Sequence, residues 1–262
     1  MRRLVSMTVA LATVLVAVGA VPAAAGQSGG PVTVSVTLDG QNIAGRTVPI
    51  DPSQSVDLAL TVDNNTDNVQ QVHSVRLSGT ALGLTFFDYD TTVPFEVPAH
   101  GRVSRELTLD LSDLDGQAIG LLPTSVAVLD AQRGVVARAD TVADVRGSIG
   151  SVYGVFGIVV FVLTVLAWGA ALLALARHRL PRNRWRRAMR FLPAGFGTGV
   201  VAVVTLSVLR VVAPAPAVEL PVIAVTTVVA LVLGYLTPHP VPPVDDRTIR
   251  IGSDLTTEGI RG

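Results

Sequence analysis

A run of 26 residues without a charged side chain, from Ser151 to Ala176, restricts the fold of this chain more than any other feature. A transmembrane α-helix needs about 20 consecutive apolar residues to cross the hydrocarbon core of a bilayer. A β-strand, by contrast, is typically about 5–6 residues long. The run therefore predicts a membrane-spanning helix over residues 151–176, with Tyr153 and Phe156 near one end, where interfacial aromatic residues gather.

Two further apolar runs follow the first. Residues 191–212 are interrupted only by Arg210, and residues 217–236 carry Glu219 near their start. Hydrophobic residues make up 49% of the chain and charged residues 15%, whereas soluble domains average about 25% charged residues. A single apolar helix can be buried in a soluble domain, but three successive long runs favour lipid as the surrounding medium. The sequence therefore predicts a membrane domain of three transmembrane helices.

The loop predicted between the first two helices, residues 177–190, is rich in arginine and contains no acidic residue. Its seven arginines are Arg177, Arg179, Arg182, Arg184, Arg186, Arg187 and Arg190. Short loops with an excess of basic residues stay in the cytoplasm. The segment before the first helix and the link 213–216 are then extracytoplasmic, and the Pro-rich, flexible tail 237–262 is cytoplasmic.

The formal net charge of zero hides a strong polarity along the chain. Residues 30–150 carry seven arginines against fifteen acids, a net charge of −8, while residues 177–190 carry +7. The arginine cluster has two interpretations: it determines topology and is solvated by headgroups, or it binds anionic lipid headgroups or a partner. We expect no nucleic-acid binding, because neither an aromatic-rich sheet nor a recognition helix accompanies the charge.

The N-terminus has the pattern of an export signal. Arg2 and Arg3 precede an uncharged apolar region from Leu4 to Val21, and the small residues 23–25 form a cleavage site. We predict a signal peptide over residues 1–25 and a linker over 26–30; the alternative is an uncleaved anchor. Both place the following segment outside a bacterial plasma membrane. The bacterial assignment rests on composition, since all 20 basic residues are arginine and Ala, Val and Gly abound.

Residues 31–146 alternate between apolar and polar side chains. The pattern recurs in residues 32–38, 56–62 and 107–111, separated by Gly-, Asn- and Asp-rich turns. Period-two alternation with regular turns is typical of an antiparallel sandwich, in which one face of each strand is buried. The chain has no cysteine, so disulfides are excluded. The segment is long enough to form a two-sheet core without them.

Two stretches of this segment resemble a known family. Residues 55–67 combine an apolar strand with an Asn-rich turn, and residues 97–103 carry a Pro-x-x-Gly entry to a late strand. Both are similar to bacterial immunoglobulin-like envelope modules of the cell-adhesion-related, CARDB-like type. The resemblance implies an all-β immunoglobulin-like sandwich ectodomain and a role in adhesion, carbohydrate proximity or protein docking. It carries over no catalytic residue.

Enzyme and cofactor motifs are missing from the sequence. The four histidines are scattered, and no Walker loop, His-Glu-x-x-His helix or thiol site is present. The acidic stretches 88–90 and 110–116 leave two interpretations, solvated turn aspartates or a loose calcium loop. An EF-hand is excluded, because Leu111 and Leu122 occupy its first and last ligand positions. We therefore predict a non-enzymatic protein without a cofactor or a specific metal site.

Two residue pairs within the predicted helices are candidates for specific contacts. Gly195 and Gly199 form a small-xxx-small pair, which either packs the three helices together or joins two copies of the chain. Arg210 and Glu219 lie at the outer ends of neighbouring helices, where they either form an ion pair or reach water separately.

These features predict a three-pass envelope protein whose external sandwich binds a protein or a polymer. An accessory subunit of an envelope transport or glycan-assembly complex is a second hypothesis. A signal relay across the membrane is a third, although no effector domain supports it.

Overall fold

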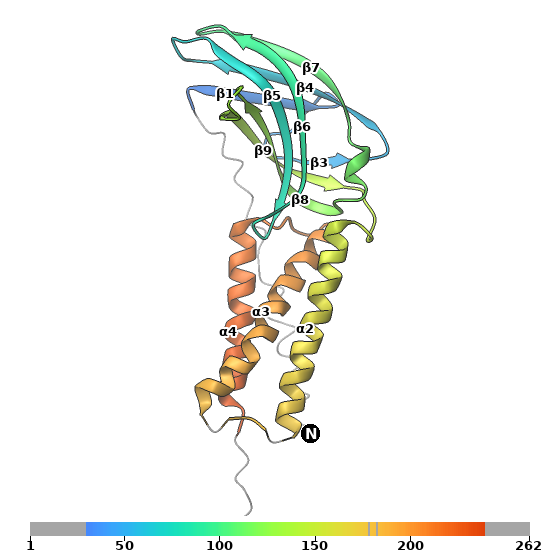
Figure 1. Cartoon of the computed structure of the whole chain (residues 1–262), viewed down its shortest axis with the longest axis vertical. Coiled ribbons are helices and arrows are strands. Elements are labelled where there is room, and N and C mark those ends of the chain that lie inside the picture. Colours follow the sequence, from blue (N-terminus) through green and yellow to red (C-terminus); the bar gives the residue numbers. More distant parts are fainter. Residues whose placement is uncertain (1–29, 178, 182, 239–262) are drawn as a thin grey trace, which may run out of the picture.

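The computed structural model describes residues 30–177, 179–181 and 183–238 and places a two-sheet β-domain at one end of three long helices (Figure 1). The predicted signal peptide and most of the predicted tail lie outside the described residues. The helices are α2 (Val152–Ala176), α3 (Arg184–Val208) and α4 (Pro216–Leu236), and each is long and apolar enough to cross a membrane. The coarse prediction, a β-domain followed by three apolar helices, is confirmed.

The β-domain consists of a four-stranded and a five-stranded sheet. The first contains, in order, β2 (Gln41–Asn42), β1 (Val32–Leu38), β4 (Ser55–Asn64) and β7 (Arg102–Asp110). The second contains, in order, β3 (Thr47–Ile50), β9 (Val135–Val145), β8 (Gly120–Leu129), β5 (Gln70–Ala81) and β6 (Leu84–Val97). All neighbouring strands are antiparallel except β3, which runs parallel to β9. A short 3-10 helix, η2 (Ser112–Leu114), precedes β8.

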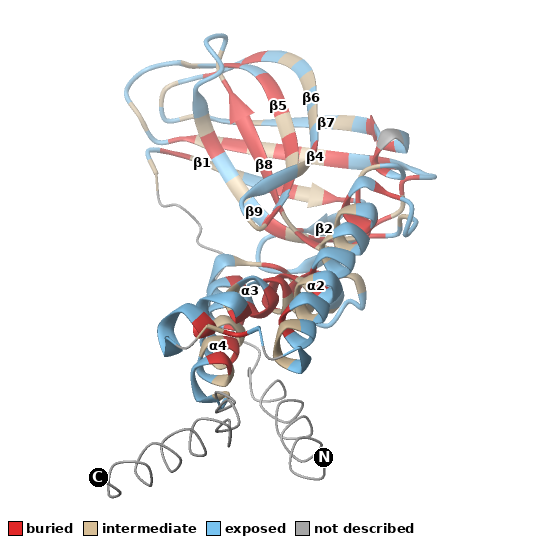
Figure 2. Ribbon diagram, turned by 60° about the horizontal axis from the view of Figure 1, so that its bottom comes forward, coloured by how far each residue is buried: buried red, intermediate tan, exposed pale blue. Residues whose placement is uncertain are grey.

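The alternation in the sequence produces the core of this domain. In β4, four apolar side chains at every second position are at most 5% exposed: Val56, Leu58, Leu60 and Val62. Inward-facing residues of both sheets, such as Leu60 and Val126, belong to one buried cluster. Burial of apolar area is the main stabilising contribution, about 25 cal/mol per Å². Figure 2 shows the buried positions, in red, on strands of both sheets.

The hairpin of β5 and β6 reaches from the core to the helices. Ala81 pairs with Leu84, so only two residues form the turn, and both have positive φ: 53° at Leu82 and 72° at Gly83. Such turns match the right-handed twist of the strands but normally favour Gly or Asn at both positions. A leucine in the left-handed region costs of order 1–3 kcal/mol, which surrounding contacts must offset.

The helix boundaries differ from the predicted ones mainly at α3. This helix begins at Arg184, inside the predicted loop 177–190, and ends at Val208 rather than at 212. The early start has a local cause, because the Asn183 side chain accepts hydrogen bonds from the backbone N–H groups of Trp185 and Arg186. Hydropathy located the apolar part of this helix but not its polar first turns.

Asn64 joins two loops at the end of the β-domain farthest from the helices. Its side chain is 1% exposed, and its Nδ2 donates to the carbonyl oxygens of Asn68, Val97 and Pro98 at 2.8–3.2 Å. Its Oδ1 accepts from the backbone N–H and the hydroxyl of Thr66. Asn64, in the Asn-rich turn of the sequence, therefore links the β4–β5 and β6–β7 loops through hydrogen bonds.

Substituting Asn64→Ala should lower the melting temperature of the full chain in detergent by about 5 °C or more, because several buried polar groups lose their partners. Thermal unfolding followed by tryptophan fluorescence or circular dichroism measures this. Asn65→Ala is the matched control, since Asn65 is exposed and should change the melting temperature by about 1 °C or less. Equal shifts in melting temperature for the two variants would contradict this role of Asn64.

Candidate functional site

The first candidate site is the junction where the β-domain meets one end of all three helices. At α2, the N–H groups of Val152 and Tyr153 donate to the carbonyl oxygens of Gly116 and Gln117, at 3.0 and 3.2 Å. The Ser151 hydroxyl accepts from the N–H of Gly154 and caps the helix. The N–H groups that a helix start leaves unpaired are thus bound by the segment before β8.

Aromatic packing adds to this contact. Tyr153 is fully buried, and its ring meets Phe86 of β6 edge to face, with 4.7 Å between the ring centroids. Phe86 makes a second edge-to-face contact with Phe156 at 5.6 Å. The two aromatic residues that the sequence placed at the membrane interface therefore contact the β-domain.

The end of α3 touches the start of β8 closely. The Ser207 hydroxyl donates to the carbonyl oxygen of Leu121 at 2.6 Å. A β-carbon on Gly120 would lie only 2.5 Å from the carbonyl oxygen of Ser207, and the φ of Gly120 is +86°. Both observations require glycine at position 120, because a side chain would push the helix away from the strand.

The first turn of α4 holds the tip of the β5–β6 hairpin. Glu219 is 7% exposed, and its Oε1 accepts a 2.7 Å hydrogen bond from the backbone N–H of Leu82. The carboxylate lies in the first helical turn, where the helix dipole stabilises negative charge. This hydrogen bond helps to offset the left-handed backbone of Leu82.

Of the two alternatives for Arg210 and Glu219, the ion pair does not occur in the described chain. Arg210 Nε instead lies 2.5 Å from Oδ1 of Asp144 at the end of β9. The reason is geometric: α3 ends at Val208, and Arg210 adopts a left-handed turn with φ of 59°. Each of the two charges thus binds the β-domain rather than the other.

The opposite end of the helices carries the arginine cluster, except Arg182, which lies outside the described residues. Arg187 is 3% exposed; its Nε donates to the Gly234 carbonyl at 3.0 Å and its Nη2 to the Tyr235 carbonyl at 3.2 Å. It therefore caps the end of α4, where a positive charge is favourable. Within the cluster, Arg187 therefore joins α3 to α4.

The other described arginines of the cluster, Arg177, Arg179, Arg184, Arg186 and Arg190, are exposed. The guanidinium carbon of Arg184 lies 5.8 Å from the centre of the Tyr235 ring. Arg190 donates to the carbonyl oxygen of Arg179 at 3.1 Å and so ties the loop to α3.

Gly195 and Gly199 both face α4 of the same chain. A β-carbon on Gly195 would lie 2.4 Å from that of Ala230, and one on Gly199 would lie 2.5 Å from the Thr226 hydroxyl. Of the two predicted uses of this pair, the described contacts are those of packing within the bundle.

Three acids of the stretches 88–90 and 110–116 have local partners. Asp88 and Asp90 lie 3.5 and 3.1 Å from the guanidinium of Arg76. The backbone N–H of Ser112 lowers the pKa of Asp110 below its usual range. Within the described residues, no three His, Asp or Glu side chains lie close enough to hold a metal ion.

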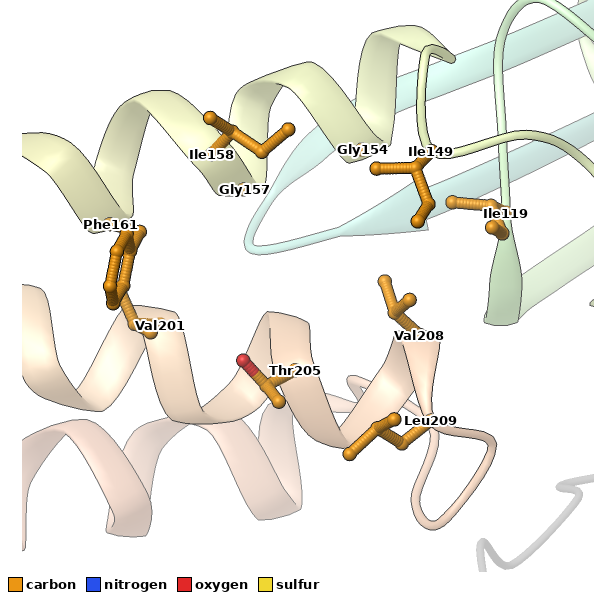
Figure 3. A pocket seen from close by; sticks show the side chains of 10 residues that line it. All are labelled: Ile119, Ile149, Gly154, Gly157, Ile158, Phe161, Val201, Thr205, Val208 and Leu209. Carbon is orange, nitrogen blue, oxygen red and sulfur yellow. The ribbon is translucent and has the colours of Figure 1, made fainter.

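A second candidate site is an apolar groove along the seam of α2 and α3, directly below the β-domain (Figure 3). We call it the lateral groove. Its volume is about 240 Å³, and Ile119 and Ile149 line the end nearest the β-domain. Thr205 supplies the one side-chain polar atom among its lining residues.

No family model and no curated protein matches this chain. Among solved structures it is similar to a Niemann-Pick type C2 protein from the Japanese carpenter ant, with a TM-score of 0.32 and 10% identity, over 47% of this chain and 98% of that chain. It is also similar to the Pseudomonas fluorescens alkylpurine DNA glycosylase AlkC bound to DNA containing an abasic site analog, with a TM-score of 0.29, 13% identity, and coverage of 44% and 31%. Neither likeness bears on the function of this chain.

The sequence analysis missed Leu82, Gly120, Asp144 and Ser207 as junction residues. Only Gly120 carries a local signal, a glycine at the start of an apolar strand, which often marks a close approach of two backbones. The other three look like ordinary turn, strand and helix residues, because their partners are 66 to 137 residues away.

A double-mutant cycle distinguishes the two partners of Arg210. The Arg210→Ala and Asp144→Ala substitutions should be coupled by about 0.5–1 kcal/mol in the free energy of unfolding, as for partly exposed ion pairs. Arg210→Ala and Glu219→Ala should be additive within about 0.3 kcal/mol. Equilibrium unfolding of the full chain in mixed micelles measures both cycles. Coupling to Glu219 without coupling to Asp144 would refute the observed pairing.

Proposed function

We propose that this chain is a non-enzymatic bacterial cell-envelope protein that holds an immunoglobulin-like sandwich above the outer face of the plasma membrane and presents it to a protein or polymer partner. The observation that carries the proposal is the junction, where the ends of all three helices bind the β-domain. Such an arrangement sets the orientation of the β-domain relative to the membrane plane.

The strand order supports the immunoglobulin-like assignment. In chain order, β4, β5, β8 and β9 correspond to the B, C, F and G strands of such folds, with B in one sheet and C, F and G in the other. β1 and β3 divide the first strand between the two sheets, with β3 parallel to β9.

The charge distribution supports the orientation. The exposed arginines of the loop after α2 and of the first turns of α3 lie at the helix ends opposite the β-domain (Figure 1). The positive-inside rule assigns that end to the cytoplasm, where these arginines meet anionic headgroups. The β-domain, with its excess of acids, is then extracytoplasmic.

The loops farthest from the helices are the proposed partner surface. We define these far-end loops as residues 65–69, 98–101 and 130–134. Two of them correspond to loops that recognise antigens in antibody variable domains. His100 and Arg133 hold left-handed backbone, with φ of 50° and 62°, and such strained non-glycine positions concentrate at functional sites. Val69 is 55% exposed there.

A second candidate function is that of an accessory subunit in a larger membrane complex. The specific observation is α2, which packs against α3 along one face and is coloured largely as exposed in Figure 2. Phe161, Leu163 and Leu166 are 54–62% exposed along it. A face of this kind can bind lipid or the helices of another subunit.

Affinity purification of the tagged full-length chain, cross-linked in intact cells and identified by mass spectrometry, tests the proposal. Wild type should recover a specific envelope protein or cell-wall polymer. The double variant Val69→Arg/Gln132→Arg should lower the recovery about tenfold or more, because two added charges occupy the proposed surface.

Glu106→Arg, an exposed substitution on β7 outside the far-end loops, is the matched control and should retain the partner. Retention by the double variant together with loss on Leu163→Arg would favour the accessory-subunit function. Recovery of no partner by wild type would contradict both.

A further inference from the structure

We propose that the first turns of α3 form a binding site for the headgroup phosphate of one anionic phospholipid. Arg186 and Arg190 bind the phosphate, and Trp185 packs beside the acyl chains of the same lipid. This site rests on the membrane location given in the proposed function, but it does not involve the far-end loops or their partner.

The two arginines lie next to each other without a counterion. Arg186 and Arg190 are four residues apart on α3, so they share one face of the helix, and both are exposed. Like charges at this spacing repel each other. Among the described residues neither arginine pairs with an acid, because the ion pairs of the described chain all lie in the β-domain or at the junction. A phosphate that accepts hydrogen bonds from both guanidinium groups removes the repulsion.

The loop before α3 is held against the same pair. Arg190 Nη1 donates to the carbonyl oxygen of Arg179 at 3.1 Å, and Leu180 is only 6% exposed. The guanidinium of Arg190 keeps further N–H donors for an anion after this bond is made. Since residues 177–190 contain no acid, the local potential is positive. An anion therefore meets a site whose backbone is already in place.

An apolar stripe on α3 identifies lipid as the source of the phosphate. Trp185, Met189 and Phe196 are 66%, 53% and 51% exposed. At 3.6 residues per turn they lie within about 40° of one another around the helix, and the arginine pair lies about 100° further round. A phospholipid can place its phosphate at the arginines and its chains along this stripe, whereas free phosphate leaves the stripe uncovered.

The position along the helix agrees with headgroup depth. Residues 191–208, the apolar part of α3, span about 27 Å at 1.5 Å per residue, close to the about 30 Å of hydrocarbon in a bilayer. Arg186 and Arg190 precede this part and are separated by about 6 Å along the axis. The polar layer on each side of the hydrocarbon is about 5–7 Å thick. Both arginines therefore fall at the level of lipid phosphates, at the helix ends opposite the β-domain (Figure 1).

Native mass spectrometry of the full chain tests this proposal, using micelles that contain equal amounts of dioleoyl phosphatidylglycerol and dioleoyl phosphatidylcholine. The two lipids have the same chains and differ in headgroup charge. Wild type should retain one phosphatidylglycerol, with a preference of about tenfold over phosphatidylcholine. The double variant Arg186→Lys/Arg190→Lys should lower this preference about threefold or more, because lysine keeps the charge but lacks the planar fork of donors.

Arg177→Lys/Arg184→Lys is the matched control, because it makes the same change at two exposed arginines of the cluster outside the pair; it should bind as wild type does. Fluorescence gives an independent readout. The chain has two tryptophans, so Trp168→Phe leaves Trp185 as the reporter. Phosphatidylglycerol brominated on its chains should quench Trp185 more strongly than brominated phosphatidylcholine.

Four results would each overturn the proposal: equal retention of the two lipids by wild type, equal loss in the two lysine variants, displacement of the lipid by excess inorganic phosphate, or a lipid preference that appears only after removal of residues 245–262. The last result would show that acids of the tail, which lies outside the described residues, occupy the arginines. Val69→Arg/Gln132→Arg should retain the lipid, so loss of the lipid and loss of the envelope partner are separate outcomes.

Discussion

The hydrogen bond between the Leu82 backbone and the buried carboxylate of Glu219 is the contact on which the architecture depends. It joins the tip of a β-hairpin to the first turn of α4, 137 residues later in the chain. Glu219 gains a hydrogen-bond donor and a helix N-terminus, and both stabilise its negative charge. Leu82 gains a partner that offsets its left-handed backbone. Each residue is therefore stabilised in its conformation by the other element.

The remaining junction contacts extend this dependence to all three helices. The start of α2 finds its backbone acceptors in the segment before β8, and the Ser207 hydroxyl of α3 binds the carbonyl of Leu121. Arg210, which follows the end of α3, pairs with Asp144. The base of the β-domain thus completes the hydrogen bonding of the helix ends. The helices are therefore part of the same folded unit as the β-domain rather than an independent anchor.

Periodicity and hydropathy predicted those helices and strands that are determined by their own local sequence pattern. The uncharged run 151–176 became α2 (Val152–Ala176), and the alternation in residues 56–62 became the buried face of β4. The first turns of α3 were not predicted, because the polar residues 184–190 have the hydropathy of a loop. Asn183 is a residue type favoured at helix N-caps and was the one local signal for this helix start. Arg187 could not be separated from its exposed neighbours by sequence, since its burial depends on the carbonyls at the end of α4. Neither alternative for Arg210 and Glu219, an ion pair or separate contact with water, included the partners in the structure, Asp144 and the backbone of Leu82, because both partners come from distant strands.

The most direct test of the account measures whether the β-domain and the helices move as one body. The chain has no native cysteine, so Gln132→Cys in a far-end loop and Val159→Cys on α2 can carry two spin labels without background. Double electron–electron resonance in nanodiscs should give a single narrow distance distribution, and adding Glu219→Ala should broaden it, because the hairpin loses its acceptor. A broad or multi-peaked distribution in the protein with an intact Glu219 would contradict the rigid junction.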